Sequence, residues 1–397
     1  MTKYTRLTAA AGLFMGFALC SATAQPVEPW REPQDTAAAL LEPDRYAWRL
    51  FVALNWPANI ATKDADTSKP FGAPGSVVWE TWRNVNPLSA DTVFRQDGSD
   101  PGPWLGTGGP VAVARVERQF DAVPIKQQVF LAARQRSRAA SGPILTFDAM
   151  VGNLNEVRLN ASTYEFIRQN KLFNIQGQVA QFSAGKENLV FPLAAKEVKA
   201  QWRKIREADK ARYHWAEVTR NNGTKETWGM TALHIITKDL PNWFWATFEH
   251  IDNKQTGPLP DPDAPPNVGW LTQSVDRVAC PTPPHNCEQA PSGIGLEGTK
   301  WANYRLRGTQ IDFIDTIGIP TILANSQIES PFQRQSSCIT CHARATISRD
   351  GTEDAGFFPP SVGPPVPEWF RDPLTRQRIY MQLDFVWSLR RASPASQ

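Results

Sequence analysis

One short motif, Cys338-Ile-Thr-Cys-His342, constrains what this chain can be more than any other feature of its sequence. On a helix, residues three and four apart share a face, so Cys338, Cys341 and His342 would present two thiols and one imidazole to a single planar group. The thiols can bond to the two vinyl groups on one edge of a porphyrin, and the imidazole can bind its iron. The spacing is typical of covalent haem attachment, and we predict one haem c, with its iron, at this motif.

Two other chemistries use the same pair of cysteines. A redox dithiol also has the spacing C-x-x-C, but it prefers a preceding strand and has no use for the histidine that follows here. A zinc site would need two more ligands, which Cys280 and Cys287 could supply. Both remain alternatives to haem.

The N-terminus has the pattern of an export signal. Lys3 and Arg6 precede an apolar run over residues 7–19, and Ala22-Thr-Ala24 is a cleavage site of the A-x-A type. The apolar run is too short to span a bilayer, and no later stretch of about 20 apolar residues follows. We expect residues 1–24 to be a signal peptide and the mature protein to be soluble and periplasmic, with no transmembrane anchor.

The remaining cysteines predict a disulfide. Cleavage of the signal peptide removes Cys20, and the motif accounts for two of the other four, which leaves Cys280 and Cys287. Because an oxidising compartment favours pairing, we predict a Cys280–Cys287 disulfide. A metal site that combines these two cysteines with His285 is the alternative.

Charge narrows the choice of partners. The 42 basic and 39 acidic residues nearly balance, so the formal net charge is only +3. Proteins that bind nucleic acids or membrane surfaces usually carry a one-sided basic excess. We therefore expect no nucleic-acid partner and no membrane-surface partner.

Hydrophobic periodicity and turn residues predict an α+β fold. We expect a helix over residues 37–54 and strands over residues 111–129, 188–205, 228–237, 243–250 and 301–313. Asn221-Asn-Gly223 is typical of a hairpin turn, Pro331 after Ser330 predicts the start of the helix that carries the motif, and 376–391 is a terminal element. The predicted divisions are a signal peptide (1–24), a strand-rich α+β domain (25–278), a disulfide-bearing linker (279–295) and a small, mainly helical haem-binding region (296–397).

The region around Cys338 resembles the c-type cytochromes. Ser336-Ser-Cys-Ile-Thr-Cys-His342, Trp243-Phe-Trp-Ala-Thr-Phe-Glu-His-Ile-Asp-Asn253 and Asp384-Phe-Val-Trp-Ser-Leu389 together resemble large monohaem proteins of the cytochrome c family in Gram-negative bacteria. The resemblance runs from about Trp48 to the C-terminus. It implies a periplasmic haem protein with electron-transfer activity and a cytochrome-c-like haem segment, and it gives a role only to the two cysteines and the histidine of the motif.

The second axial ligand of the iron is a separate question. Met381 lies on the terminal element, where a small cytochrome c would carry its methionine, although it could equally pack in a core. His234 and His250 are the runners-up, and histidines in apolar strands are often simply buried. Met230, on the same predicted face as His234, is a weaker candidate. The other two histidines, His214 and His285, are expected at the surface.

Three functions fit these residues. The first is one-electron transfer to or from a periplasmic redox partner protein. The second is a haem enzyme with an open axial position, in which Glu249, His250 and Asp252 are candidate acid–base groups, unless these carboxylates only cap and form ion pairs. The third is a docking subunit of a periplasmic dehydrogenase. No substrate follows from the sequence.

Overall fold

The computed structural model describes residues 28–104, 153–219, 224–254, 293–329, 336–356 and 362–396. Its α-helices are α1 (Thr36–Leu41), α2 (Pro43–Leu54), α4 (Ala161–Gln169), α5 (Ile175–Ser183) and α7 (Cys338–Ala343). Its strands are β1 (Ala58–Asn59), β2 (Asp64–Ala65), β3 (Arg83–Asn84), β4 (Asn153–Leu159), β5 (Lys196–Lys204), β6 (Trp215–Thr219), β7 (Lys225–Thr237), β8 (Phe244–His250), β9 (Tyr304–Gln310), β10 (Thr346–Ser348) and β11 (Tyr380–Gln382). Short 3-10 turns are η1 (Val78–Thr81), η3 (Glu207–Asp209), η4 (Ile251–Lys254), η5 (Lys300–Asn303), η7 (Pro367–Phe370) and η8 (Trp387–Arg391).

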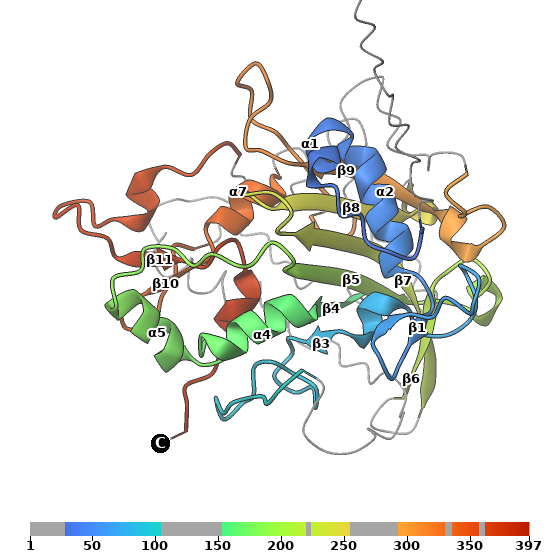
Figure 1. Ribbon diagram of the computed structural model, residues 1–397, viewed down its shortest axis with the longest axis horizontal. Coiled ribbons are helices and arrows are strands. Elements are labelled where there is room, and N and C mark those ends of the chain that lie inside the picture. The colour runs from blue at the N-terminus through green and yellow to red at the C-terminus, as the bar shows by residue number, and fades with distance from the viewer. Residues whose placement is uncertain are drawn as a thin grey trace, which may run out of the picture.

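A seven-stranded antiparallel sheet forms the centre of the described structure. Its strand order is β3-β4-β5-β7-β8-β9, and β6 pairs with the N-terminal part of β7. The strands cross the middle of the molecule, with α7, β10 and β11 at one end and β6 at the other (Figure 1). The prediction of an α+β fold with a strand-rich sheet is confirmed.

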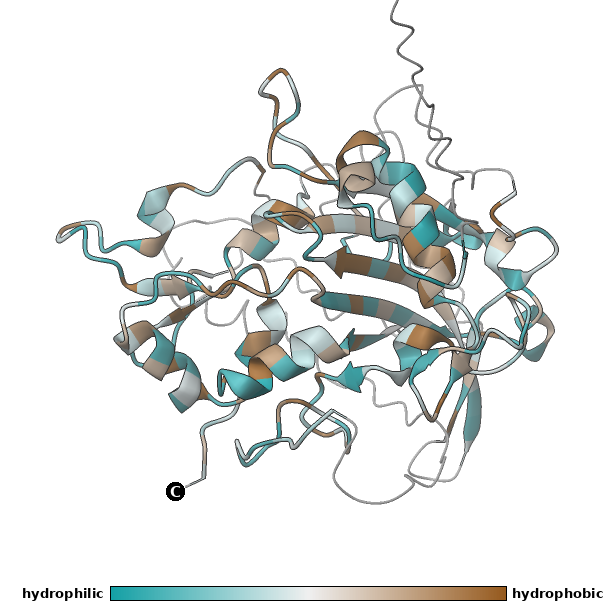
Figure 2. Ribbon diagram, in the orientation of Figure 1, coloured by the Kyte–Doolittle hydropathy of each residue, from teal (hydrophilic) through white to brown (hydrophobic). Residues whose placement is uncertain are grey.

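Helices α1 and α2 cover one face of the sheet. The rings of Trp48 and Phe51 pack on Phe248 of β8, with centroids 5.0 and 4.4 Å apart. Hydrophobic residues are visible on β8 and on these two helices (Figure 2). This face forms the first hydrophobic core, and its residues alternate along each strand with those that face the opposite side.

The opposite face packs against the C-terminal part of the chain. Trp245 of β8 points to this side and belongs to a second core, which also contains Cys338, Met381 and side chains of α4 and α5. The sheet therefore separates two cores, and the C-x-x-C-H motif lies on the face that α2 does not cover. This arrangement positions the candidate site.

The hairpin predicted at Asn221-Asn-Gly223 agrees with the pairing of β6 with β7, although the three turn residues lie outside the described ranges. The prediction that Met230 and His234 share a face of β7 is wrong, because the register with β5 shifts between Gln201 and Trp202. This bulge places Trp228 and Met230 in the first core, whereas Ile236 belongs to the second. Met230 therefore shares a face with Leu233 and Ile235, and not with His234.

Several predicted boundaries move. The helix expected over 37–54 is two helices, because Pro43 starts a new one. The strand expected from 188 begins at Lys196, and the strand expected over 301–313 is limited to Tyr304–Gln310. The described part of 296–397 contains one six-residue α-helix, three short 3-10 turns, three strands and irregular backbone, so it is less helical than predicted. The main sheet also crosses the predicted boundary at residue 296, since β9 pairs with β8.

The predicted signal peptide, the strand over 111–129, and Cys280, Cys287 and His285 lie outside the described residues. Among the helices that the structure does describe, none has the length and apolar character needed to cross a membrane.

Candidate functional site

The motif lies on α7, as predicted, but the helix begins later than expected. Ser337 is its N-cap, and the Ser337 hydroxyl accepts a hydrogen bond from the backbone N–H of Thr340 at 3.3 Å. Residues 336 and 337 are not helical, so a continuous helix from Pro331 after Ser330 is excluded. Serine is a favoured N-cap because its oxygen satisfies an N–H that has no partner within the helix.

The two cysteines and the histidine occupy adjacent positions on this short helix. Cys338 is buried, with its Sγ 3.6 Å from the carbonyl oxygen of Leu323, whereas Cys341 and His342 are half-buried. Helical spacing places the two sulfurs three residues apart on one face, with the imidazole beside them.

The imidazole of His342 is held by a backbone carbonyl. Its Nδ1 lies 2.7 Å from the carbonyl oxygen of Phe385, and its ring packs edge-on against Trp245 at a centroid distance of 4.7 Å. A carbonyl oxygen can only accept, so Nδ1 carries the proton and donates it to Phe385. The lone pair is then on Nε2, which is the arrangement of a histidine that binds a metal through Nε2.

Both ends of α7 are anchored to the rest of the fold. At its start, the side-chain amide of Gln310 in β9 accepts from the backbone N–H of Ile339 at 3.0 Å and donates to the Ser337 hydroxyl at 2.8 Å. At its end, Trp387 Nε1 donates to the carbonyl oxygen of Cys341 at 3.0 Å. These bonds fix the direction in which the motif faces the second core.

Met381, the predicted distal ligand, lies in the same core as Cys338. It is fully buried in β11, opposite Ile347 of β10. Tyr380, the residue before it, faces a separate small cluster, so the side chain of Met381 points inward. The structure thus brings the predicted methionine to the apolar surroundings of the motif.

The two alternative distal histidines are placed differently. His234 is half-buried on β7, with Nε2 3.6 Å from a carboxylate oxygen of Glu329. His250 lies at the far end of β8 from Trp245, which contacts the motif. His250 is five positions further along the strand than Trp245, a distance of roughly 16 Å. The structure does not bring His250 to the motif.

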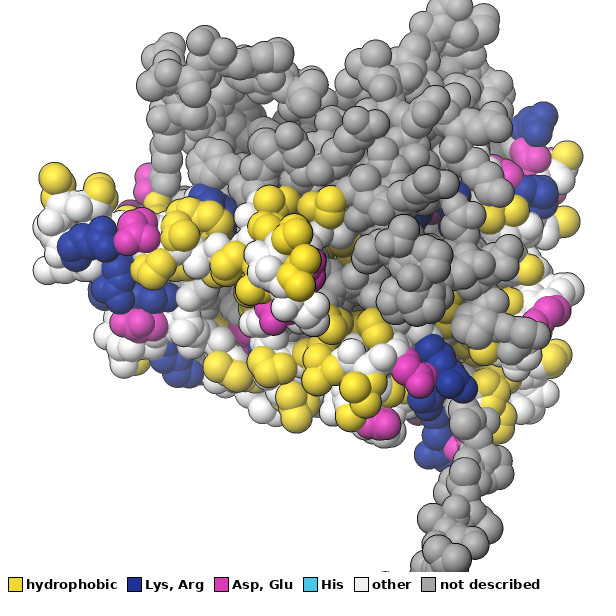
Figure 3. All heavy atoms as spheres, turned by 90° about the horizontal axis from the view of Figure 1, so that it is seen from above, with side chains coloured by type: hydrophobic (Ala, Val, Ile, Leu, Met, Phe, Trp, Pro, Cys, Tyr) yellow, Lys and Arg dark blue, Asp and Glu magenta, His cyan; other side chains and the backbone are white. Residues whose placement is uncertain are grey.

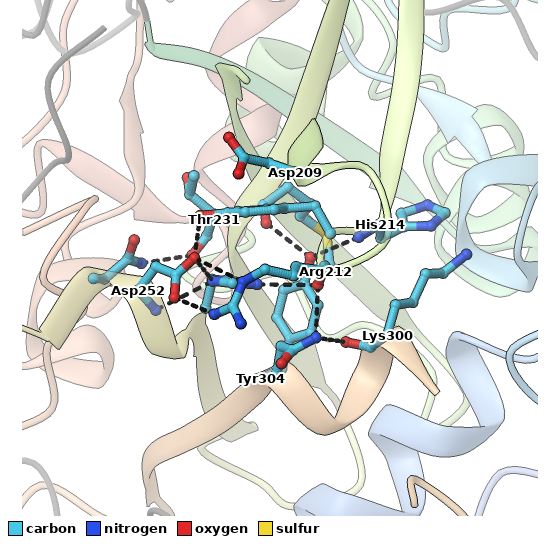
Figure 4. Close-up of polar contacts among 12 residues, drawn as sticks. Asp209, Arg212, His214, Thr231, Asp252, Lys300 and Tyr304 are labelled. Carbon is cyan, nitrogen blue, oxygen red and sulfur yellow. Dashed lines mark hydrogen bonds and ion pairs between the residues drawn. The ribbon is translucent and has the colours of Figure 1, made fainter. Parts of the chain in front are cut away.

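His250 belongs to a polar cluster at the other end of the sheet. Its Nε2 donates to the carbonyl oxygen of Arg212 at 3.1 Å, and its Nδ1 accepts from the backbone N–H of Asp252 at 3.2 Å. Tyr213 stacks on the imidazole at 3.7 Å and donates to Asp252. The side chains of Arg212 and Asp252 also pair with each other, and Figure 4 shows these contacts close to Tyr304.

The burial of His250 predicts a loss of stability in acid. Desolvation lowers its pKa from 6.5 to about 4. The unfolded chain therefore binds a proton between pH 6.5 and 4 that the folded chain does not, so the contribution is complete above pH 6.5 and declines as the pH falls toward 4. We expect a decline of up to about 3 kcal/mol in the free energy of unfolding from this residue.

Urea unfolding at pH 7 and pH 4.5 measures this effect. His250→Phe keeps the ring stack and removes the titrating group, so its free energy of unfolding should fall less with acid than that of the wild type. Equal losses in the two proteins would contradict the assignment.

The candidate acid–base carboxylates are engaged in ion pairs. Glu249 is fully buried; one of its oxygens accepts from Arg305 at 2.7 Å and Arg307 at 2.8 Å, and the other accepts from Ser326. Asp252 pairs with Arg212. These contacts match the ion-pair interpretation of the two carboxylates.

The expected surface position of His214 is wrong. Only 2% of His214 is exposed; its Nε2 contacts a carboxylate oxygen of Glu80, and its ring stacks on Trp301 at 4.9 Å. Its ring also lies 5.7 Å from that of Trp202, another residue of the first core, and local sequence around His214 gives no sign of these contacts.

Sequence reasoning missed the residues that hold the motif in place, namely Phe385, Trp245, Gln310 and Trp387. A backbone carbonyl as acceptor has no residue signature, and Gln310 lies far from the motif in the chain. Among the residues that the structure describes, no group of three or more His, Cys, Asp or Glu side chains is arranged to hold a metal ion. Comparisons of the chain with protein-family models, with curated proteins and with solved structures find no match.

Proposed function

We propose that this protein is a periplasmic monohaem c-type cytochrome of the cytochrome c family that transfers electrons one at a time. One observation carries the proposal: the Nδ1 of His342 donates to the Phe385 carbonyl, on a helix that also presents Cys338 and Cys341. This bond selects the tautomer that an iron-binding histidine needs. The spacing of the motif predicts haem attachment but does not specify the histidine tautomer. The hydrogen bond to Phe385 is therefore an independent argument.

The side chains around the motif fit a haem. The two thiols would form the covalent links and Nε2 of His342 would be the axial ligand, while the core around them is apolar and aromatic. When bound, haem supplies an iron that alternates between the ferric and ferrous states. The chain itself contributes an imidazole held in place by a hydrogen bond. It also contributes a buried environment, which raises the free-energy cost of a change in the charge of the iron.

Met381 is the proposed sixth ligand, because it is buried, points into the same core as Cys338 and carries a thioether. A methionine ligand raises the reduction potential, which suits acceptance of electrons from dehydrogenases. A closed sixth position also favours electron transfer over catalysis. The ion pairs of Glu249 and Asp252 support the same choice, since both carboxylates are paired with arginines.

A Met381→Ala substitution tests the sixth position. The wild-type protein should be low-spin in both oxidation states and should not bind carbon monoxide when reduced. The variant should become partly high-spin and bind it readily. Leu383→Ala, a comparable truncation two residues away in the same core, should leave the spectrum unchanged. A wild-type iron that already binds carbon monoxide, with no change in the variant, would favour the haem-enzyme alternative.

A redox partner protein is part of the proposal. The described C-terminal part exposes large apolar side chains, including Ile317, Ile319 and Leu374, which are 77%, 57% and 91% exposed. Figure 3 shows hydrophobic side chains among polar ones on the described part of one face. Exposed apolar surface of this kind suits contact with another protein. The same exposed side chains fit the alternative of a docking subunit of a dehydrogenase. The two differ only in whether the contact with the partner protein is transient or permanent.

A further inference from the structure

The carbonyl that receives the His342 hydrogen bond belongs to an unusual turn. Asp384 and Phe385 have φ angles of +48° and +69°, a region that non-glycine residues seldom adopt. A bulky residue such as phenylalanine is not stable there by itself, so contacts elsewhere must hold the turn.

Asp384 supplies those contacts from a buried carboxylate. One oxygen accepts from the backbone N–H of Phe191 at 2.7 Å, and the other accepts from Nζ of Lys238 at 2.7 Å. The side chains of Lys238 and Asp384 are each only 7% exposed. Little solvent reaches the pair, so its geometry is well defined.

Lys238 connects this turn to the sheet. It follows the last residue of β7, and its ammonium also donates to the carbonyl oxygen of Pro241 at 2.8 Å. The same ammonium lies 5.6 Å from the ring of Trp243, another residue with a positive φ, +60°. Two residues later, Trp245 packs on His342. One ammonium thus joins both segments that contact the imidazole.

We propose that Lys238 and Asp384 form a positioning pair that sets the strength of the His342–Phe385 hydrogen bond and, through it, the reduction potential of the haem iron. This inference rests on the proposed function. A strong bond from Nδ1–H makes Nε2 a better electron donor and favours the ferric state. If the pair is broken, the Phe385 carbonyl moves, the bond weakens and the ferric state loses that preference.

The test is a redox titration of the full-length protein purified from the periplasm. For Lys238→Met, we expect the equilibrium constant for reduction to rise three- to tenfold, a shift of about 30 to 60 mV for a one-electron couple. Asp384→Asn is the gentler second variant, because asparagine tolerates positive φ and keeps the acceptor for Phe191. It should shift the potential in the same direction by less. In proton spectra of the reduced protein, the exchangeable Nδ1 proton of His342 should exchange faster in both variants.

Lys196→Met is the matched control. Lys196 is another lysine with a 7% exposed side chain, and it pairs with Glu32 at 3.0 Å and Asp239 at 3.8 Å rather than with Asp384. This variant should lose similar stability and keep the wild-type potential. The inference is overturned if Lys238→Met and Asp384→Asn carry haem and keep the wild-type potential, or if Lys196→Met shifts it equally. Wild-type protein without covalent haem on a denaturing gel would instead refute the proposed function, and the inference with it.

Discussion

Replacing His342 with alanine is expected to remove haem-bearing protein from the periplasm almost completely. The variant loses the imidazole of His342, whose Nδ1 donates to the Phe385 carbonyl and whose Nε2 therefore carries the lone pair. Even outer-shell partners of metal ligands change affinity or activity by about 10–100-fold, so loss of the ligand itself should reduce the haem-loaded yield at least about tenfold. Haem staining on a denaturing gel, normalised to total protein, measures the yield.

The control is His234→Ala, which removes another half-buried histidine on the same side of the sheet. It should retain the wild-type haem content and spectrum. A normal yield and spectrum for His342→Ala would contradict the assignment of this residue, and a lost spectrum in His234→Ala would point to that histidine as a ligand.

Replacing Glu249 with glutamine is expected to lower the free energy of unfolding by about 3–5 kcal/mol, the usual effect of removing one partner from a buried ion pair. Glu249 is fully buried against Arg305 and Arg307, which are 2% and 1% exposed. The variant leaves both guanidinium groups without this carboxylate. Urea unfolding at neutral pH measures the difference.

An exposed pair provides the comparison. Glu217 and Lys225 lie 2.7 Å apart with side chains 38% and 61% exposed, so Glu217→Gln should change stability by less than about 1 kcal/mol. Equal, small losses in the two variants would show that Glu249 is not a structural anchor. That result would make its candidacy as an acid–base group credible again.

The sequence correctly predicted those strands and helical positions that depend only on neighbouring residues. The alternation in Lys225–Thr237 and the aromatic run Phe244–His250 gave the central strands, because side chains alternate across a sheet. The spacing of Cys338, Cys341 and His342 gave a shared helical face. These predictions need only neighbouring residues.

Contacts between distant segments could not be predicted in the same way. The bulge opposite Gln201 changes the face of β7, and nothing in the strand itself marks it. His214 is buried because Glu80 and Trp301, remote in sequence, converge on it. The Phe385 carbonyl depends on a turn held by Lys238, so the part of the site that selects the tautomer is a product of tertiary structure.

The most direct test of the central claim is the intact mass of the denatured mature protein, combined with acid–acetone extraction. We predict that the mass equals the processed chain plus one haem, and that the haem absorbance stays with the protein after extraction, because the proposed function requires both cysteines of the motif to form thioether bonds. A mass equal to the bare chain, with the thiols of Cys338 and Cys341 both reactive and any haem released into the acetone, would contradict covalent attachment and with it the proposed function.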